Sequence, residues 1–407
     1  MKVIEGSVTA AKGFEAAAAA AQIKYKGRND MALVYSTVPA VAAGTFTTNV
    51  VKAAPVKWDQ EIVYNQPKAQ AVVINSGIAN ACTGAEGYDC CKAIADTAAS
   101  VLGVDAGAVL VASTGVIGVQ LPVEKLKNGV KLLAKAKAAT PEAGDAAAHA
   151  IMTTDTVSKQ VAVTVEIGGR TVTIGGMCKG SGMIHPNMCT MLSFVTTDAA
   201  ISKELLQEAL SASIQDTYNM VSVDGDTSTN DTVLLLANGM AENPVIDKKD
   251  ENYKLFKDAL DYVNTELSKK IAGDGEGATA LFEVKIVGAA SKKDAVTLAK
   301  SIVTSSLVKA AVYGHDANWG RILCAMGYSG VAFDPEKVDL FFESAAGKIQ
   351  ICENGVAINF SEETATKILS ESAVTAVADV KMGDAAATAW GCDLTYDYVK
   401  INADYRS

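Results

Sequence analysis

The chain has 407 residues, of which 49% are hydrophobic and 20% charged, and its formal net charge is −10. This length exceeds one ordinary hydrophobic core, so we expect two or three compact units in a soluble globular protein. Because no basic stretch reverses the acidic balance locally, a nucleic-acid partner is not expected.

No segment reaches the roughly 18 uninterrupted apolar residues of a membrane-spanning helix, so no membrane partner is expected. The N-terminal residues lack the apolar region of a secretory signal. The eight cysteines form no CxxC motif and have no zinc-like spacing with the three histidines. We therefore expect reduced thiols, no bound metal and a cytoplasmic location.

Strands and helices alternate in the first half of the chain. Apolar runs predict buried strands, apolar positions three and four apart predict helices, and alternation around Gly168-Gly169 predicts a β-hairpin. The predicted elements are a strand at 70–74, a loop at 75–84, a helix at 88–102, a strand at 108–112, a helix at 121–138 and the hairpin at 158–176.

The second half continues with helices and strands. An apolar run from Met191 predicts a buried strand, and Ser202 is typical of a helix N-cap. The further predicted elements are helices at 202–219, 251–271 and 292–303, a strand at 281–289 and a short helix near Trp319. This mixture predicts an α/β (α+β) fold, with a catalytic region at 1–285 and a C-terminal α/β domain at 286–407.

Two loops look like ligand-binding motifs but have the wrong context. Gly273 to Ala278 (GDGEGA) follows a helix, whereas a dinucleotide fingerprint follows a strand and opens a helix. Asp224 to Asp231 (DGDTSTND) has alternating oxygen ligands but lacks the central glycine of a calcium loop, and Leu235 occupies the place of its glutamate.

The three histidines belong to no catalytic motif. His149 is expected on a helix surface or in the core, and His315 is expected to form hydrogen bonds in a loop. His185 lies five residues before Thr190 and could act as a proton shuttle, but a solvent-facing side chain in a turn is the preferred interpretation. The sequence contains no GxSxG motif.

A turn that contains glycine and proline precedes Thr190, and the apolar run follows it. If the Cys189–Thr190 peptide bond breaks, the freed α-amino group, with an ordinary pKa of about 7.7–8.0, lies within reach of the Thr190 hydroxyl as its base. The turn would present the Cys189 carbonyl to that hydroxyl, and water would complete the cleavage. The alternative is an ordinary threonine at the start of a strand.

The stretch KGSGMIHPNMCTMLSFVTTDA (179–199) resembles the self-cleavage segment of the ornithine acetyltransferases, the glutamate N-acetyltransferase family of arginine biosynthesis. Further segments resemble the same family: NSGIANACTG (75–84), STGVIG (113–118), VDGDTSTNDT (223–232), GDGEGAT (273–279), GHDANWGRI (314–322) and YDYVKINADYRS (396–407). The sequence departs from the family pattern at Cys189, where alanine is usual, and at Ser76 and Ile78, where alanine and asparagine are usual.

The resemblance implies a layered αββα sandwich of the kind shared with self-processing aminopeptidases, with a C-terminal tail that folds back to the active site. It also implies cleavage between Cys189 and Thr190 into an α chain (1–189) and a β chain (190–407) that stay associated. A dimer of such α/β pairs is the expected assembly.

The implied activity is acetyl transfer from N2-acetyl-L-ornithine to L-glutamate through an acetyl-Thr190 intermediate, with no cofactor. Thr114 and Gly115 are the implied oxyanion hole, and the implied substrate-binding residues are Thr153, Lys179, Thr190, Glu276, Asn402 and Ser407. Acetyl-CoA as a second donor is left open. The alternatives are a self-processing aminopeptidase or amidase, in which water resolves the acyl-enzyme, and a binding protein that never matures.

Overall fold

The computed structural model describes residues 1–185 and 191–404. The chain divides into two compact units. Unit 1 comprises Met1–Gly180, Pro186–Asn219 and Thr227–Leu267, and unit 2 comprises Ser181–His185, Met220–Asp226 and Ser268–Ser407. The division falls inside one long helix, and the domain boundary expected near residue 285 stays a prediction.

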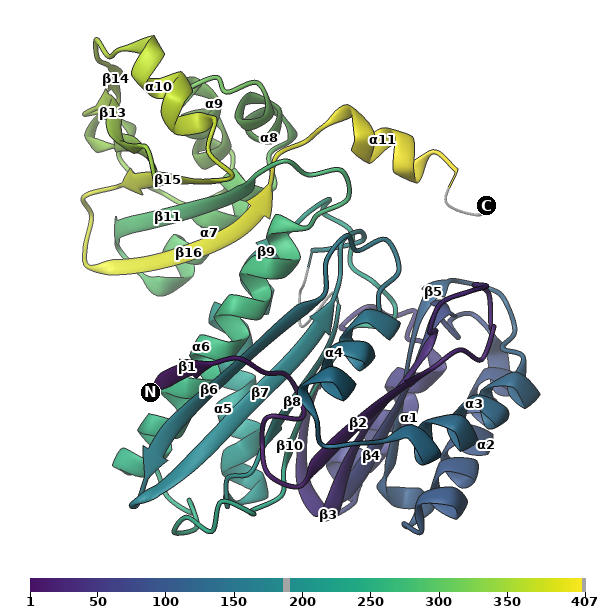
Figure 1. The fold of residues 1–407 in the computed structure, drawn as a ribbon. Coiled ribbons are helices and arrows are strands. Elements are labelled where there is room, and N and C mark those ends of the chain that lie inside the picture. The colour runs from purple at the N-terminus through teal and green to yellow at the C-terminus, as the bar shows by residue number, and fades with distance from the viewer. Residues whose placement is uncertain (186–190, 405–407) are drawn as a thin grey trace. The chain divides into compact units, whose positions relative to one another are not determined.

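The described strands of unit 1 form one nine-stranded sheet, with eight strands in the order β1-β6-β7-β8-β10-β3-β4-β5 and the ninth, β2, paired to β3 (Figure 1). They are β1 (Lys2–Ile4), β2 (Phe14–Ala19), β3 (Met31–Phe46), β4 (Ala69–Ile78), β5 (Val109–Val116), β6 (Lys159–Ile167), β7 (Arg170–Lys179), β8 (Leu192–Thr197) and β10 (Thr232–Ala237). The N-terminal half of β3 pairs with β2 and β4, and its residues 41–46 pair with β10. We call the side with β1, β6, β7, β8 and β10 sheet A, and the side with β2, β4 and β5 sheet B.

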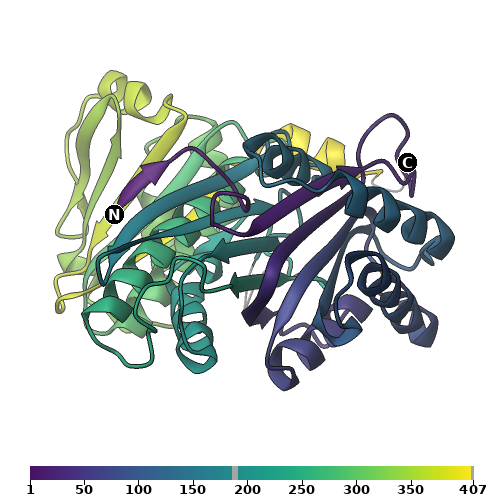
Figure 2. The same cartoon turned by 60° about the horizontal axis from the view of Figure 1, so that its bottom comes forward.

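Sheets A and B enclose a hydrophobic core. Val34 of β3 contributes to it from sheet B, and Phe194 and Leu234 contribute from β8 and β10 of sheet A. Because successive side chains of a strand point to opposite faces, Leu33 lies on the other side of β3, in a second cluster that includes Ile94 of α2 (Gly84–Leu102). Helices α2 and α3 cover this outer face of sheet B (Figure 2).

Helices α5 and α6 cover the outer face of sheet A. A Cβ built on Gly176 in β7 would lie 3.0 Å from Leu267 and 3.3 Å from Val263, both of α6. The helices of unit 1 are α1 (Ala54–Asn65), α2 (Gly84–Leu102), α3 (Val123–Ala136), α4 (Pro141–Ala150), α5 (Lys203–Asp216) and α6 (Glu251–Gly273), which runs on into unit 2. The order helix, sheet, sheet, helix confirms the expected mixed α/β fold with an αββα sandwich.

Most predicted elements are confirmed, and the differences concern their ends. Helix α7 (Lys292–Val303) has the expected bounds, and the Ser202 hydroxyl caps α5 by accepting the N–H of Leu205. Strands β4 and β5 run further than predicted, to Ile78 and Val116, because their parallel pairing continues into the small-residue segments. The loop expected at 75–84 therefore begins only after β4 ends.

Unit 2 contains a seven-stranded sheet among its described residues, in the order β14-β13-β12-β15-β11-β16-β9. Its strands are β9 (Val221–Ser222), β11 (Leu281–Ala289), β12 (Asp339–Ser344), β13 (Gly347–Glu353), β14 (Val356–Ala357), β15 (Ala373–Asp379) and β16 (Ala385–Cys392). Besides α7, its helices are α8 (Ser306–Tyr313), α9 (Trp319–Gly327), α10 (Glu362–Leu369) and α11 (Tyr396–Asn402). No single described helix is long and apolar enough to cross a membrane, and only α7 and α8 taken together, with a bend of 58° between them, meet that length and composition.

Candidate active site

The parallel strands β4 and β5 end side by side and present Thr114 and Gly115. Thr114 is half-buried, and Gly115 has a φ of 131°, in the region that favours glycine. A Cβ built on Gly115 would overlap the backbone carbonyl of Gly77. The close approach of the two strands therefore requires glycine here, and it fixes the backbone of the two residues expected to form an oxyanion hole.

Three of the family-like segments meet at these strand ends. Asn230 donates through Nδ2 to the carbonyls of Ala79 at 2.6 Å and Ser113 at 2.8 Å. The Ser113 hydroxyl donates to Asn75 Oδ1 at 2.7 Å. All four residues are buried, so these bonds hold the three segments together in a low-dielectric environment.

The two departures from the family pattern in β4 are accommodated by their surroundings. Ser76 is buried, and its hydroxyl donates to the carbonyl of Ala150 at 2.8 Å. Ile78 is buried in the apolar cluster beneath α2. Ser76 pairs with Thr114 in regular register, and the register between β4 and β5 shifts at Ile78, which pairs with both Thr114 and Val116.

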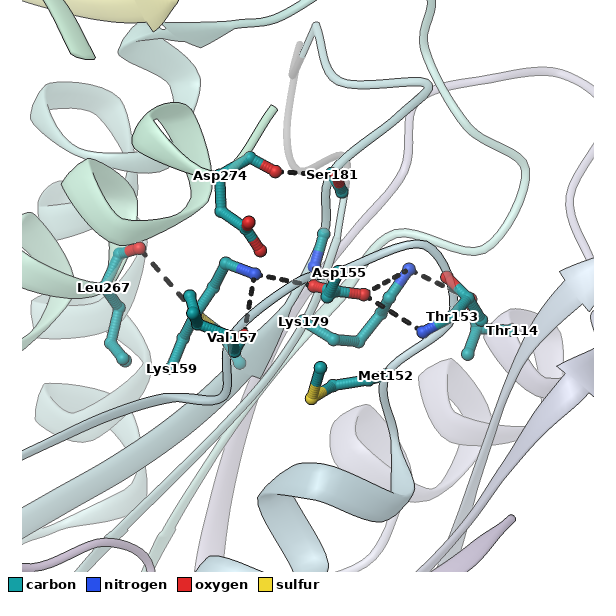
Figure 3. A network of polar contacts seen from close by, with 12 residues as sticks. Thr114, Met152, Thr153, Asp155, Val157, Lys159, Lys179, Ser181, Leu267 and Asp274 are labelled. Carbon is teal, nitrogen blue, oxygen red and sulfur yellow. Dashed lines mark hydrogen bonds and ion pairs between the residues drawn. The ribbon is translucent and has the colours of Figure 1, made fainter. Parts of the chain in front are cut away.

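Lys179, the last residue of β7, places its ammonium next to Thr114. Its Nζ lies 3.4 Å from Thr114 Oγ1 and 3.9 Å from Asp155 Oδ2 (Figure 3). Because an ammonium only donates, the Thr114 oxygen accepts here, and the hydroxyl proton is left for another acceptor. This arrangement can stabilise a carboxylate or an oxyanion beside Thr114.

Asp155 lies in the loop between α4 and β6, and its side chain is fully buried. Its Oδ1 accepts from Lys159 Nζ and from the N–H of Gly180, both at 2.7 Å, and its Oδ2 accepts from the N–H of Thr153 at 3.0 Å (Figure 3). Burial alone would raise the pKa of Asp155, but the charges of Lys179 and Lys159 outweigh it and hold the pKa well below its ordinary value. The amino-acid sequence alone does not reveal Asp155 and Lys159, because no spacing marks an ion pair between a loop and a strand.

Glu276 of unit 2 is buried in the glycine loop that follows α6. Its backbone N–H donates to the carbonyl of Ser181 at 3.0 Å, and the Ser181 hydroxyl donates to the carbonyl of Asp274 at 2.6 Å. A Cβ built on Gly182 would overlap the Glu276 carboxylate. Within unit 2, this close packing explains why Ser181 and Gly182 are small.

Helix α11 packs against the same glycine loop within unit 2. Asn402 Nδ2 donates to Glu276 Oε2 at 2.6 Å, and the Thr395 hydroxyl donates to the carbonyl of Gly277 at 2.7 Å. The hydroxyl of Tyr398 is hydrogen-bonded with Asp224, and burial together with the Asp224 charge raises its pKa. Two proposed substrate contacts, Glu276 and Asn402, are thus in direct contact.

The histidines lie in three different settings. His149 is an exposed residue of α4, as expected, and His315 Nδ1 lies 3.3 Å from the Ser370 hydroxyl, which confirms a loop residue that forms a hydrogen bond. The solvent-facing interpretation of His185 is wrong: the side chain is half-buried, with Nδ1 3.0 Å from Ser222 Oγ. Burial lowers the pKa of His185, because it disfavours the charged imidazolium.

Cys189, Thr190 and Ser407 lie outside the described residues. The strand expected from Met191 is confirmed as β8, which begins at Leu192 and all of whose residues are buried. Met191 is buried, and its carbonyl accepts the N–H of Thr232 at 2.9 Å.

Across residues 1–185 and 191–404, no group of three or more His, Cys, Asp or Glu side chains could hold a metal ion. The carboxylate of Asp224 accepts the backbone N–H groups of Met183 at 2.6 Å, Ile184 at 2.8 Å and Asp226 at 3.1 Å. These bonds give the first residue of the aspartate-rich loop a structural role in a turn.

The layered sandwich carries the ammonium of Lys179 beside the strand-end hydroxyl of Thr114, an arrangement that can stabilise an oxyanion of the kind formed in acyl transfer. The model of the ArgJ family matches residues 15–407. The chain is 51% identical over 407 residues to the arginine biosynthesis bifunctional protein ArgJ of Caldanaerobacter subterraneus, with 100% of both chains covered. It is 53% identical over 409 residues to the protein of the same name from Symbiobacterium thermophilum, again with 100% of both covered. The chain belongs to the ArgJ family and is an acyltransferase of arginine biosynthesis.

A solved structure of a relative shows the same fold over part of the chain. It is the crystal structure of the arginine biosynthesis bifunctional protein argJ from Bacillus halodurans, which matches with a TM-score of 0.51 and 48% identity. The match covers 53% of this chain and 100% of that chain.

Proposed function

We propose that the enzyme transfers the acetyl group of N2-acetyl-L-ornithine to L-glutamate, releasing ornithine and N-acetylglutamate. The observation that carries the proposal is the Lys179 ammonium 3.4 Å from the Thr114 hydroxyl, next to the fixed backbone of Gly115. Acyl transfer between amino acids requires a cation that binds the α-carboxylate and hydrogen-bond donors that stabilise the oxyanion. Membership of the ArgJ family supports these substrates.

The enzyme first cleaves itself between Cys189 and Thr190. The Thr190 hydroxyl attacks the Cys189 carbonyl, the acyl group moves from nitrogen to oxygen, and water hydrolyses the ester to leave a free α-amino group on Thr190. The products are an α chain (1–189) and a β chain (190–407) that stay associated. The chain in the crystal structure of the Bacillus halodurans relative covers 53% of this chain, a share that fits the length of the proposed β chain.

Acetyl transfer then proceeds through an ester on Thr190. The α-amino group takes the proton of the Thr190 hydroxyl, which attacks the acetyl carbonyl and expels ornithine, and glutamate then attacks the acetyl-Thr190 ester. The Thr114 hydroxyl and the Gly115 N–H donate to the oxyanion of each tetrahedral intermediate, and one such donor contributes on the order of 3–4 kcal/mol. One amide is consumed and one is formed, so the exchange requires neither a cofactor nor a metal.

Charged side chains recognise the ends of the substrates. We assign the α-carboxylate to Lys179 and the side-chain ammonium of ornithine to Glu276, because each pairs opposite charges in a desolvated place. Thr153, Asn402 and Ser407 complete the proposed contacts. Acetyl-CoA as a second donor remains part of this proposal, as do a cytoplasmic location and a dimer of α/β pairs.

The main alternative is a self-processing aminopeptidase or amidase, in which water instead of glutamate resolves the acyl-enzyme. An assay of acetylornithine consumption with and without glutamate separates the two, since a hydrolase consumes the donor without glutamate. A binding protein that never matures would give a single full-length band on a denaturing gel.

The decisive experiment is the intact mass of the purified protein before and after brief exposure to acetylornithine. We expect two fragments, with one acetyl group gained by the fragment that begins at Thr190. A single uncleaved chain, or cleavage without acetylation, contradicts the proposal.

A further inference from the structure

The side chain of Asp155 connects two residues of the candidate site, Thr153 and Lys179, and also binds the backbone of Gly180. Its Oδ2 accepts the backbone N–H of Thr153 at 3.0 Å, and its Oδ1 accepts the backbone N–H of Gly180 at 2.7 Å (Figure 3). The ammonium of Lys179 lies 3.9 Å from Oδ2. Thr153 and Lys179 are proposed substrate contacts, and Asp155 contacts both of them.

Lys159 secures this carboxylate from another direction. Its Nζ donates to Asp155 Oδ1 at 2.7 Å, and the exposed fractions of the two side chains are 1% and 0%. A buried carboxylate that accepts two backbone N–H groups and one ammonium cannot rotate without breaking a charge-assisted bond. Asp155 is therefore a fixed negative charge in the loop that precedes β6.

The Lys179 ammonium lies at the end of a flexible side chain, so a fixed negative charge is needed to hold it in one position. It lies between Asp155 Oδ2 at 3.9 Å and Thr114 Oγ1 at 3.4 Å. Lys159 makes the short bond to Asp155, and Lys179 makes the longer ion pair. Asp155 thus attracts the Lys179 ammonium to one place without engaging it in a tight hydrogen bond, so the ammonium can still donate to an incoming carboxylate.

We propose that Asp155 is a positioning residue of the acetyl-transfer site: it holds the ammonium of Lys179 beside Thr114, where that ammonium binds the α-carboxylate of the substrate. This inference rests on the function proposed above and names the group that gives the site its preference for α-carboxylate substrates. Acetylornithine and glutamate both have this carboxylate, so both half-reactions depend on Asp155.

The test is Asp155→Asn, which keeps the shape of the side chain and removes its charge. The KM values for acetylornithine and glutamate rise about 10- to 100-fold, while kcat changes less than about threefold, because Lys179 contributes to binding. N-acetyl-1,4-diaminobutane, the decarboxylated form of the donor, lacks the group that Lys179 binds. Its inhibition constant against the normal donor therefore changes less than about threefold in the variant.

Asp30→Asn is the matched control. Asp30 is also buried in unit 1, and its carboxylate accepts the backbone N–H groups of Ala21 at 2.7 Å and Ile23 at 2.6 Å. This variant lowers the melting temperature and leaves KM unchanged. If both KM values of Asp155→Asn stay within twofold of the wild type, or the decarboxylated analogue weakens as much as acetylornithine, Asp155 has only a structural role.

The double variant Asp155→Asn/Lys159→Met separates positioning from charge balance in the core. In Asp155→Asn the ammonium of Lys159 stays buried without its carboxylate, and Lys159→Met removes that ammonium. The melting temperature of the double variant is therefore higher than that of the single variant, while its KM values remain above those of the wild type. A return of KM to the wild-type value overturns the inference. If the single variant does not fold, the double variant provides the same comparison.

Acetylation of the wild type distinguishes failure of the inference from failure of the proposed function. A wild-type fragment starting at Thr190 that gains no acetyl group refutes the function, and the inference with it. An acetylated wild type beside an Asp155→Asn variant with unchanged KM refutes the inference alone.

Discussion

The side-chain amide of Asn402 donates to the carboxylate of Glu276 at 2.6 Å and joins the C-terminal helix α11 to the glycine loop after α6. The two residues are separated by 126 positions in the sequence. No residue of α11 is buried, so the helix has little share in the hydrophobic core of unit 2. The contact therefore has more to do with the orientation of Glu276 than with the stability of the fold.

We expect Asn402→Ala to lower kcat/KM for acetylornithine about 10- to 100-fold, because a hydrogen bond to a charged group contributes about 1.5–3 kcal/mol. The melting temperature should change little. Steady-state kinetics and a thermal scan measure the two effects. Lys400→Ala is the control, since that side chain is exposed on the same helix. Full activity in Asn402→Ala would show that Glu276 needs no partner.

Thr114→Val removes a hydroxyl and keeps the shape of the side chain. Loss of one oxyanion donor should slow acetylation of the enzyme about 100- to 1,000-fold, whereas Thr114→Ser retains the donor and most of the rate. Rapid quenching followed by intact-mass measurement gives the acetylation rate directly. Equal rates in the valine and serine variants would remove Thr114 from the oxyanion hole.

Gly182→Ala places a methyl group against the Glu276 carboxylate and must displace it. Since Glu276 is the proposed partner of the ornithine ammonium, KM for acetylornithine should rise about tenfold or more, and KM for glutamate should change less. Gly327→Ala in α9 is the control, because a Cβ there has nothing within 4 Å. An equal rise in both KM values would argue against a specific role of Glu276 towards the donor.

Asp59 of α1 gives a prediction about pH. Burial raises its pKa well above the ordinary value, although Oδ1 accepts the N–H of Val111 at 2.8 Å. Oδ2 is buried with no hydrogen-bond partner in the described part of the chain. The protonated form is thus favoured in the folded state, and its contribution to stability is present below the unfolded pKa of about 3.9 and lost as pH rises through the folded pKa.

Asp59→Asn is neutral at every pH and should escape that loss. The variant should melt close to the wild type at pH 4 and above it at pH 8, as differential scanning calorimetry at the two values would show. A melting-temperature difference that is the same at both pH values would contradict a buried, protonated Asp59.

Local sequence patterns were sufficient to predict elements that are determined by residues close together in the sequence. The Ser202 cap and the periodicity of α7 act within a few residues, and both were predicted correctly. The sequence did not reveal that β3 belongs to both sheets, because this depends on pairing with strands far along the chain. The same is true of the ends of β4 and β5.

The resemblance identified segments that the structure explains physically. Gly115 and Gly182 are small because backbone or carboxylate atoms occupy the space of a side chain. Asn230 is polar because it bonds two strand-end carbonyls. Asp155 and Lys159 could not be predicted from the sequence, because they form a buried ion pair that matches no periodicity and no motif.

Strand β3 is shared by sheets A and B, and this affects how unit 1 unfolds. One continuous backbone pairs with β2 through residues 31–36, with β4 through residues 31–35 and Ala40, and with β10 through residues 41–46, with a register shift between Tyr35 and Ala40. Neither sheet A nor sheet B can therefore separate while the other keeps all of its hydrogen bonds to β3. Amide hydrogens on the two sides of the register shift should be protected from exchange with solvent to the same degree and should lose that protection in the same opening event.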